Sequence, residues 1–124
     1  MYPPIFQAVD VAAVQALLGS GSAMRFYPFG RATQGTVYPY AVYQTVYGTP
    51  ENYLDQSPDM DYFGVQIDVY ASASQGQRTA RAVLEALRDA IEPHAHITSW
   101  RPESVDPDTK SYRIGFDCDW WVQR

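Results

Sequence analysis

Two long segments alternate apolar and polar residues, and this alternation constrains the fold of the chain more than any other feature. It extends from Asp61 to Ser72 and again from Ser111 to Val122. A period of two over about twelve positions is typical of a β-strand with one covered face. The covered sides are predicted to hold Phe63, Val65, Ile67, Val69 and Ala71 in the first segment, and Tyr112, Ile114, Phe116, Cys118, Trp120 and Val122 in the second. The fold is therefore expected to centre on two long strands of a sheet.

Two helices are predicted beside these strands. Residues 75–92 repeat apolar residues at helical spacing, and the run from Ser74 to Gln77 fits a capping box at the helix start. Residues 5–18 form the other predicted helix, which ends at Gly19. The buried stripes are expected to contain Ala80, Val83, Leu84, Leu87 and Ile91 in the first helix and Val9, Ala13, Val14, Leu17 and Leu18 in the second.

Further strands are predicted at residues 24–29, 38–48 and 95–102, with a long loop over residues 49–60. The predicted order is helix, strand, strand, strand, helix, strand, strand. This order indicates an α+β fold, an antiparallel or mixed sheet of about four to five strands flanked by two helices. A chain of 124 residues is expected to form one domain, residues 1–124.

Charge and cysteine content exclude several classes of protein. Fourteen acidic residues against nine basic ones give a net charge of −5, which argues against a binder of nucleic-acid phosphates or anionic lipid. The single cysteine excludes a disulfide framework and a multi-cysteine zinc site. No apolar run approaches the ~18 residues of a membrane span, and the N-terminus lacks the features of a signal peptide. We expect a protein of a reducing cytoplasm that binds no membrane.

The candidates for chemistry are few. His94 and His96 are two residues apart, as a metal site could use, but no third ligand is evident. Because His94 follows Pro93, we expect it in a turn. Cys118 lies among the apolar residues of its strand and is expected to be a buried hydrophobe. The residues therefore predict no enzyme, no cofactor and no metal.

The most unusual local features are a tyrosine-rich strand and the acidic loop after it. Residues 49–61 contain Glu51, Asp55, Asp59 and Asp61 without a basic residue. The tyrosines before them, which include Tyr43 and Tyr47, could anchor a protein partner or simply fill the sheet. Stacking of nucleic-acid bases is the weaker interpretation, because the acidic loop would repel phosphates. Both features point to binding or assembly.

Seven stretches, in order along nearly the whole chain, together carry a resemblance to a known family, and none of them is catalytic. The stretches are Tyr2-Pro3-Pro4-Ile5-Phe6, Arg25-Phe26-Tyr27-Pro28-Phe29-Gly30, Pro39-Tyr40-Ala41-Val42-Tyr43-Gln44, Gly48-Thr49-Pro50-Glu51-Asn52-Tyr53-Leu54, Val65-Gln66-Ile67-Asp68-Val69-Tyr70, Ala80 to Ile91, and Tyr112-Arg113-Ile114-Gly115-Phe116-Asp117. In this order they resemble the small tail-completion or tail-terminator proteins of long-tailed, siphovirus-like bacteriophages and prophages.

The resemblance implies a structural virion protein that is assembled in the host cytoplasm. Proteins of this family form a ring, typically of six subunits, at the head-proximal end of the tail. The ring stops polymerisation of the tail tube and offers a joining surface to the head connector. The implied partners are further copies of the chain, the major tail-tube protein, the head–tail connector, and genomic DNA that passes through the lumen without sequence-specific binding.

A ring requires two different patches that meet around a closed circle. We expect the contacts of the subunits or of the tube near Tyr43, Tyr47, Glu51, Tyr53, Asp55, Asp59 and Asp61. An acidic loop that faced the lumen would also repel passing DNA. The alternatives are a head-side connector and a small metal- or ligand-binding hydrolytic domain that uses His94, His96 and nearby carboxylates.

Overall fold

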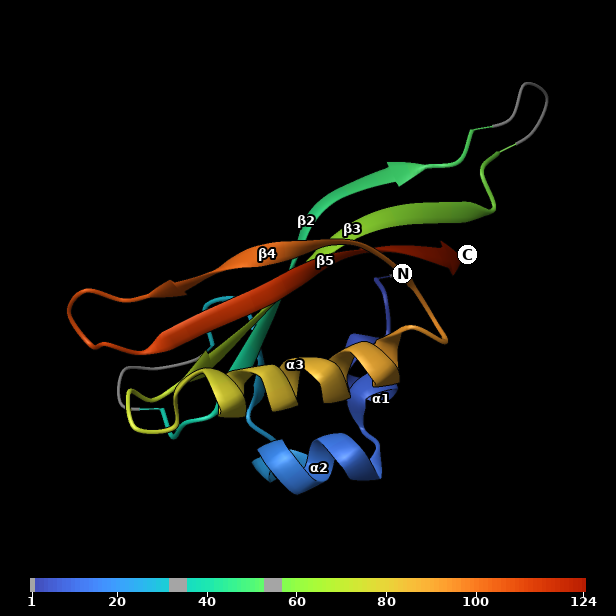
Figure 1. The fold of residues 1–124 in the computed structure, drawn as a ribbon. Helices are drawn as coiled ribbons and strands as arrows, with labels where there is room; N and C mark the ends of the chain where they lie inside the picture. Colours follow the sequence, from blue (N-terminus) through green and yellow to red (C-terminus); the bar gives the residue numbers. More distant parts are fainter. Residues whose placement is uncertain (1, 32–35, 53–56) are drawn as a thin grey trace.

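The computed structural model describes residues 2–31, 36–52 and 57–124. Within these residues the chain forms a five-stranded sheet in the order β1-β2-β3-β5-β4 (Figure 1). The strands are β1 (Phe26–Pro28), β2 (Tyr40–Pro50), β3 (Met60–Ala71), β4 (His96–Val105) and β5 (Tyr112–Gln123), and the helices are α1 (Ile5–Val9), α2 (Ala12–Leu18), the 3₁₀ turn η1 (Gly21–Ala23) and α3 (Gly76–Ile91). The predicted α+β class is confirmed. The sheet is mixed, because β1 runs parallel to β2 while the remaining pairs are antiparallel.

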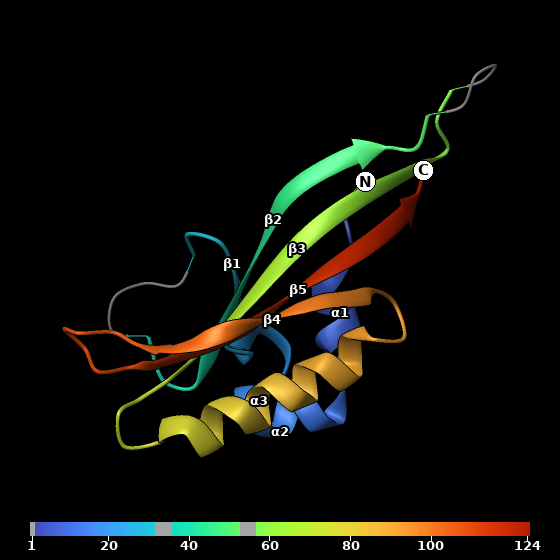
Figure 2. The same cartoon turned by 45° about the horizontal axis from the view of Figure 1, so that its top comes forward.

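The core lies between the sheet and the helices, which cover one face of the sheet (Figures 1 and 2). Strands β3 and β5 pair along their whole length, so that their apolar sides form one continuous surface. The α3 stripe of Ala80, Val83, Leu84, Leu87 and Ile91 is buried in this core, together with Val65, Ile67, Ile114 and Phe116. Full burial of such a side chain stabilises the fold by about 1.5–3 kcal/mol. Both alternating segments are thus buried on the predicted side.

The helix predicted over residues 5–18 is wrong, because two short helices take its place. Asp10 and Val11 interrupt the helical backbone, and Val11 is extended, with φ −127° and ψ 158°. The break changes the direction of the chain, so that Val9, Val14 and Leu18 all reach the core. Leu17 is only partly buried, and Ala13 is exposed rather than part of the stripe.

The capping box predicted at Ser74–Gln77 is also wrong, because the reciprocal bonds form two residues earlier. The backbone N–H of Gln75 donates to Ser72 Oγ (3.2 Å), and the backbone N–H of Ser72 donates to Gln75 Oε1 (3.0 Å). Helix α3 itself begins at Gly76, which has a φ of +65°. The capping pair therefore secures the turn that leads into the helix.

The neighbouring ends of β2 and β3 that join at the hairpin extend beyond the helical layer, with the end of β5 beside them (Figure 2). Both strands have their predicted lengths but are displaced along the sequence, β2 by two residues to Tyr40–Pro50 and β3 by one residue to Met60–Ala71. Aromatic rings lie over glycines along this pair. Gly48 leaves room for the ring of Phe63, and Gly64 leaves room for the ring of Tyr47 on the opposite face. These close contacts shape the base of the hairpin.

None of the helices in the described part of the chain is long and apolar enough to cross a membrane.

Candidate functional site

The projecting end of the β2–β3 hairpin carries several of the residues predicted to make contacts. Glu51 is exposed just after β2, and its backbone N–H donates to the carbonyl oxygen of Met60 (2.9 Å). Asp59 is also exposed, just before β3. Tyr53 and Asp55 lie outside the described residues. The described end of the hairpin therefore presents acidic side chains well away from the helices.

Asp61 is largely buried and forms an ion pair with the exposed Arg124 at the base of this hairpin. Its two carboxylate oxygens accept hydrogen bonds from Nε and Nη2 of Arg124, each at 3.0 Å. The hydrogen bonds from Arg124 lower the pKa of Asp61 below its ordinary value. Arg124 also donates from its backbone N–H to Asp59 O (2.8 Å) and from Nη1 to Pro58 O (3.2 Å). The predicted contact residue Asp61 thus ties β3 to the end of β5.

Aromatic residues gather on the sheet face that carries no helices. Tyr62 links Tyr47 to Trp121, with ring centroids 5.6 Å and 4.9 Å away respectively. The hydroxyl of Tyr47 lies 3.0 Å from that of Tyr62 and donates to Asp119 Oδ1 (3.1 Å). The side chains of Tyr47 and Trp121 are 49% and 45% exposed. We call these four residues the Tyr47 cluster; such exposed aromatics are typical anchors at protein interfaces.

Tyr43 lies on the opposite, helix-covered side of β2. Its ring stacks on Phe26 at a centroid distance of 4.9 Å, and burial raises its pKa above the ordinary value. The side chain is partly buried at the edge of the core. The structure therefore gives Tyr43 a packing role, and its predicted contact with a partner stays a prediction.

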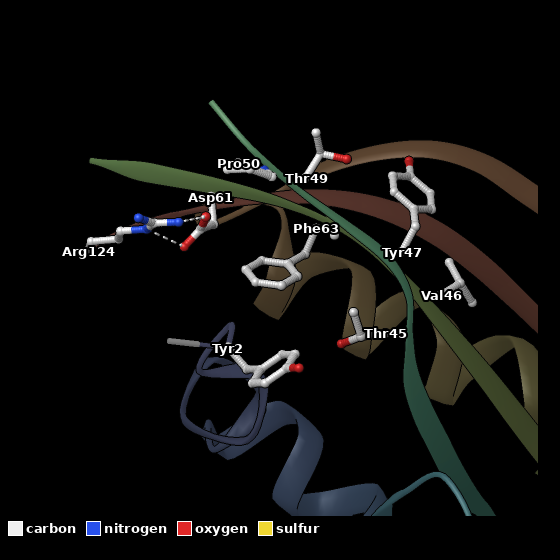
Figure 3. Close-up of a pocket in the computed structure, with 10 residues that line it drawn as sticks. Tyr2, Thr45, Val46, Tyr47, Thr49, Pro50, Asp61, Phe63 and Arg124 are labelled. Carbon is white, nitrogen blue, oxygen red and sulfur yellow. Dashed lines mark hydrogen bonds and ion pairs between the residues drawn. The ribbon is translucent and has the colours of Figure 1, made fainter. Parts of the chain in front are cut away.

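A hollow of about 560 Å³ opens beside β2, under the base of the hairpin. Figure 3 shows the rings of Tyr2 and Phe63 on the helix side of β2, with the Asp61–Arg124 pair at one end. The two rings are 5.3 Å apart. The residues that line the hollow are Tyr2, Thr45, Val46, Tyr47, Gly48, Thr49, Pro50, Asp61, Phe63 and Arg124. The hollow therefore combines an aromatic wall with one neutralised ion pair, a surface suited to packing.

A polar network occupies the centre of the uncovered sheet face. Asp68 is 7% exposed, and its Oδ2 accepts hydrogen bonds from Gln66 Nε2 (2.8 Å) and Arg113 Nη2 (3.2 Å). Arg101 Nε lies 3.5 Å from the other oxygen. Gly115, opposite Asp68 across the strands, leaves the space that the carboxylate occupies. The network therefore joins β3, β5 and β4, and it makes the centre of the uncovered sheet face polar.

The residues considered for chemistry are not brought together as a site. His94 lies in the turn after α3 as predicted, and its ring stacks on Trp120 at 6.2 Å. His96 is exposed on β4. Cys118 is buried as predicted, and burial raises its pKa to about 12. In the part of the chain that the structure describes, no three His, Cys, Asp or Glu side chains are close enough to hold a metal ion.

Tyr62 and Trp121 are contact candidates that the sequence did not single out. Both lie on the outward side of the alternating segments, where the sequence pattern predicts polar residues. An aromatic residue at such an outward position is the signal that could have identified them.

A sheet with one covered face and exposed aromatic side chains on the other is typical of a protein that binds other proteins through its surface. Comparison with known families is more specific, since the model of the family described as "Tail completion protein gp17" matches residues 4–123. The chain belongs to this family. It is a structural protein of a phage tail, and its location is the virion.

A solved structure is consistent with this fold. A chain titled "Virion of native gene transfer agent (GTA) particle" superimposes with a TM-score of 0.62 at 16% sequence identity. The match covers 97% of this chain and 92% of that chain. At this identity the similarity concerns the fold alone. Among curated proteins, none matches the sequence.

Proposed function

We propose that this protein is a tail terminator, which forms a homohexameric ring on the head-proximal end of the tail tube. One face of the ring binds the last ring of the tube protein. The other face does not reproduce that surface, so polymerisation stops and the head connector can join. The observation that carries this proposal is the family match, which extends over nearly the whole chain.

The surfaces of the fold support a role in assembly. The Tyr47 cluster and the projecting hairpin provide two different patches, and a closed ring requires its subunits to meet through unlike patches. Aromatic side chains on an uncovered sheet face supply contact area at a small cost in side-chain entropy. No step of this mechanism requires a chemical reaction, so the protein would act through the shape and the contacts of its surfaces.

The test is to mix the purified protein with isolated, unfinished tail tubes and to image the tube ends by electron microscopy. We expect an extra ring on one end of each tube and no further growth there. Bare ends that continue to grow would contradict the terminator role. Binding to the head connector protein instead would assign the protein to the head side of the joint.

The same assay tests the Tyr47 cluster. Trp121→Ala removes an exposed anchor, and loss of an interface hot spot of ~2 kcal/mol or more weakens binding about thirtyfold. We expect fewer capped tubes with an unchanged melting temperature. Phe29→Ala is the matched control, because Phe29 is also an exposed aromatic residue but lies away from the cluster. Equal capping by the two variants would remove the cluster from the interface.

A further inference from the structure

We propose that the two edges of the sheet meet between neighbouring copies of this chain, so that the first half of β4 in one copy pairs with the second half of β2 in the next. The contact rests on the ring of the proposed function and is the place where its subunits join. Because the two edges are unlike surfaces, the contact is heterologous, and its repetition closes a ring when the rotation allows.

The second half of β2 has an open outer side within the described residues. Strand β1 ends at Pro28, opposite Tyr43, so residues 44–50 pair only with β3. These seven residues, the open half of β2, include no charged side chain, and the proline comes only at the last position. Proteins usually protect a free edge with charges, prolines or a covering segment. An uncharged edge with free backbone groups is suited to receive a further strand.

Strand β4 forms the other edge of the sheet, where it pairs with β5 alone among the described strands. Its second half contains Arg101, Pro102 and Glu103, which are residues that discourage pairing at an edge. Its first half, residues 96–100, contains no proline, acid, lysine or arginine. This open half of β4 is therefore the part of the strand that can pair with another copy.

The two open halves lie at the same end of the sheet. The strand registers place four residues in one row across the sheet: Tyr47, Gly64, Asp119 and His96. Each of the three strand pairs in this row is antiparallel, so β4 runs opposite to β2. A rotated copy that continues the sheet therefore sets its β4 antiparallel to β2, which is the more stable way to pair.

The two open halves also share an irregular spacing of the side chains that face the helices. Residues on one face of a regular strand are an even number of positions apart. The register shift in β2 instead puts Thr45 and Gly48, three positions apart, on the helix side, opposite buried residues of β3. The register shift in β4 does the same for Ile97 and Trp100, opposite buried residues of β5. Two strands with the same irregularity can pair with their faces matched.

This alignment also covers the most exposed aromatic ring of β4. A stagger of about two residues, of the kind that closed sheets require, brings Trp100 beside Thr45 and Ile97 beside Gly48 of the next copy. Trp100 is 54% exposed in the single chain, although its ring contacts the core. Thr45 and Gly48 line the hollow beside β2, so the Trp100 ring would lie against its aromatic wall. A half-exposed Trp that becomes buried is the kind of residue that dominates binding at an interface.

Cysteine cross-linking tests this contact. Thr49→Cys and His96→Cys place thiols at exposed positions that lie opposite each other in the proposed alignment. The native Cys118 is buried and does not compete. The two full-length variants are mixed, at high concentration and again with tail tubes, under mild oxidation. Ser104→Cys replaces His96→Cys in the control, because Ser104 is also exposed on β4 but lies about 25 Å further along the strand.

We expect disulfide-linked dimers from Thr49→Cys with His96→Cys at a yield at least about tenfold above the Ser104→Cys control, because docking raises the effective thiol concentration to ~mM. A chain with both substitutions should give a ladder of covalent oligomers that ends at the ring number. Equal yields with both partners, or none in either condition, overturn the inference. If the wild-type protein caps tubes in the same preparation, the proposed function stands despite that failure.

A charge placed on the open half of β2 provides a second test. Val46 is 45% exposed, so Val46→Lys should leave the fold and the melting temperature unchanged, while a docked strand would have to bury the new charge. Cross-linking of the cysteine pair should fall about tenfold. Val105→Lys is the matched control, because Val105 is 54% exposed and lies outside the open half of β4. Equal cross-linking by the two lysine variants would show that this edge does not pair.

Discussion

At the scale of single residues, the turn between β4 and β5 shows how local chemistry shapes this fold. Asp106 Oδ1 accepts hydrogen bonds from the backbone N–H groups of Asp108 (2.8 Å) and Thr109 (3.0 Å). The chain then passes through Lys110, which has a φ of 61°. This left-handed conformation suits glycine, because an L side chain is strained there. The sequence indicates the turn through Asp106-Pro107-Asp108, but it gives no sign of strain at a lysine.

Lys110→Gly should therefore stabilise the protein. Relief of the left-handed strain, less the greater entropy of an unfolded glycine, should raise the free energy of unfolding by about 0.5–1 kcal/mol. The measurement is urea denaturation followed by circular dichroism. Lys110→Ala is the control, because it removes the same side chain but retains the strain. If both variants gain equally, the strain is not the cause.

Glu103 provides a test of pH dependence. It accepts hydrogen bonds from Arg81 Nε (2.8 Å) and Gln77 Nε2 (3.1 Å), and thereby ties β4 to α3. The hydrogen bond from Arg81 is the main reason why its pKa falls from the ordinary 4.5 to about 2. A lowered folded-state pKa means that the stabilisation is complete above the unfolded-state value.

The stabilisation by Glu103 should be lost as the pH falls from 4.5 to about 2. Glu103→Gln should therefore melt at a lower temperature than the wild type at pH 7, and the difference should disappear near the lower value. Thermal melts across this range check the prediction. Asp108→Asn is a control at an exposed acid of the adjacent turn. A difference that persists at the lowest pH would mean that another property of the substitution is responsible.

At the scale of elements, sequence periodicity predicted the strands and α3 well because their burial is regular. The alternation in β3 and β5 indicates that one face of the sheet is covered. The apolar stripe of α3 indicates the side of the helix that covers it. The N-terminal helix is different, since Val9, Val14 and Leu18 fit one continuous helical stripe. The break at Asp10 is required only by the directions in which α1 and α2 pack onto α3. A sequence pattern gives no information about those directions.

The reciprocal bonds before α3 lead to a prediction at this scale. Ser72→Ala removes the acceptor of the Gln75 N–H, and loss of such a cap costs ~1 kcal/mol. Ser74→Ala serves as the comparison, because the Ser74 hydroxyl bonds to the hydroxyl of Ser72 at 3.2 Å and, among the described residues, caps no backbone N–H. Denaturant unfolding should show the larger loss for Ser72→Ala. A larger loss for Ser74→Ala would support the capping box that the sequence predicted.

At the scale of the whole molecule, the contact surfaces could be predicted only in part. The acidic stretch near Glu51 is visible in the sequence as charge without a basic partner. The pairing of Asp61 with Arg124 is not, because 63 residues separate them and only the antiparallel register of β3 and β5 brings them together.

The outer edge of β2 has a consequence for hydrogen exchange. In the described part of the chain, β1 pairs only with Ala41–Tyr43, whereas β3 is flanked by β2 and β5 along its length. Backbone amides of residues 44–49 that point away from β3 should therefore exchange within seconds in the free subunit, while those of β3 should exchange only on global unfolding. Deuterium uptake at this edge, measured before and after addition of tail tubes, would report directly whether assembly places another polypeptide against it.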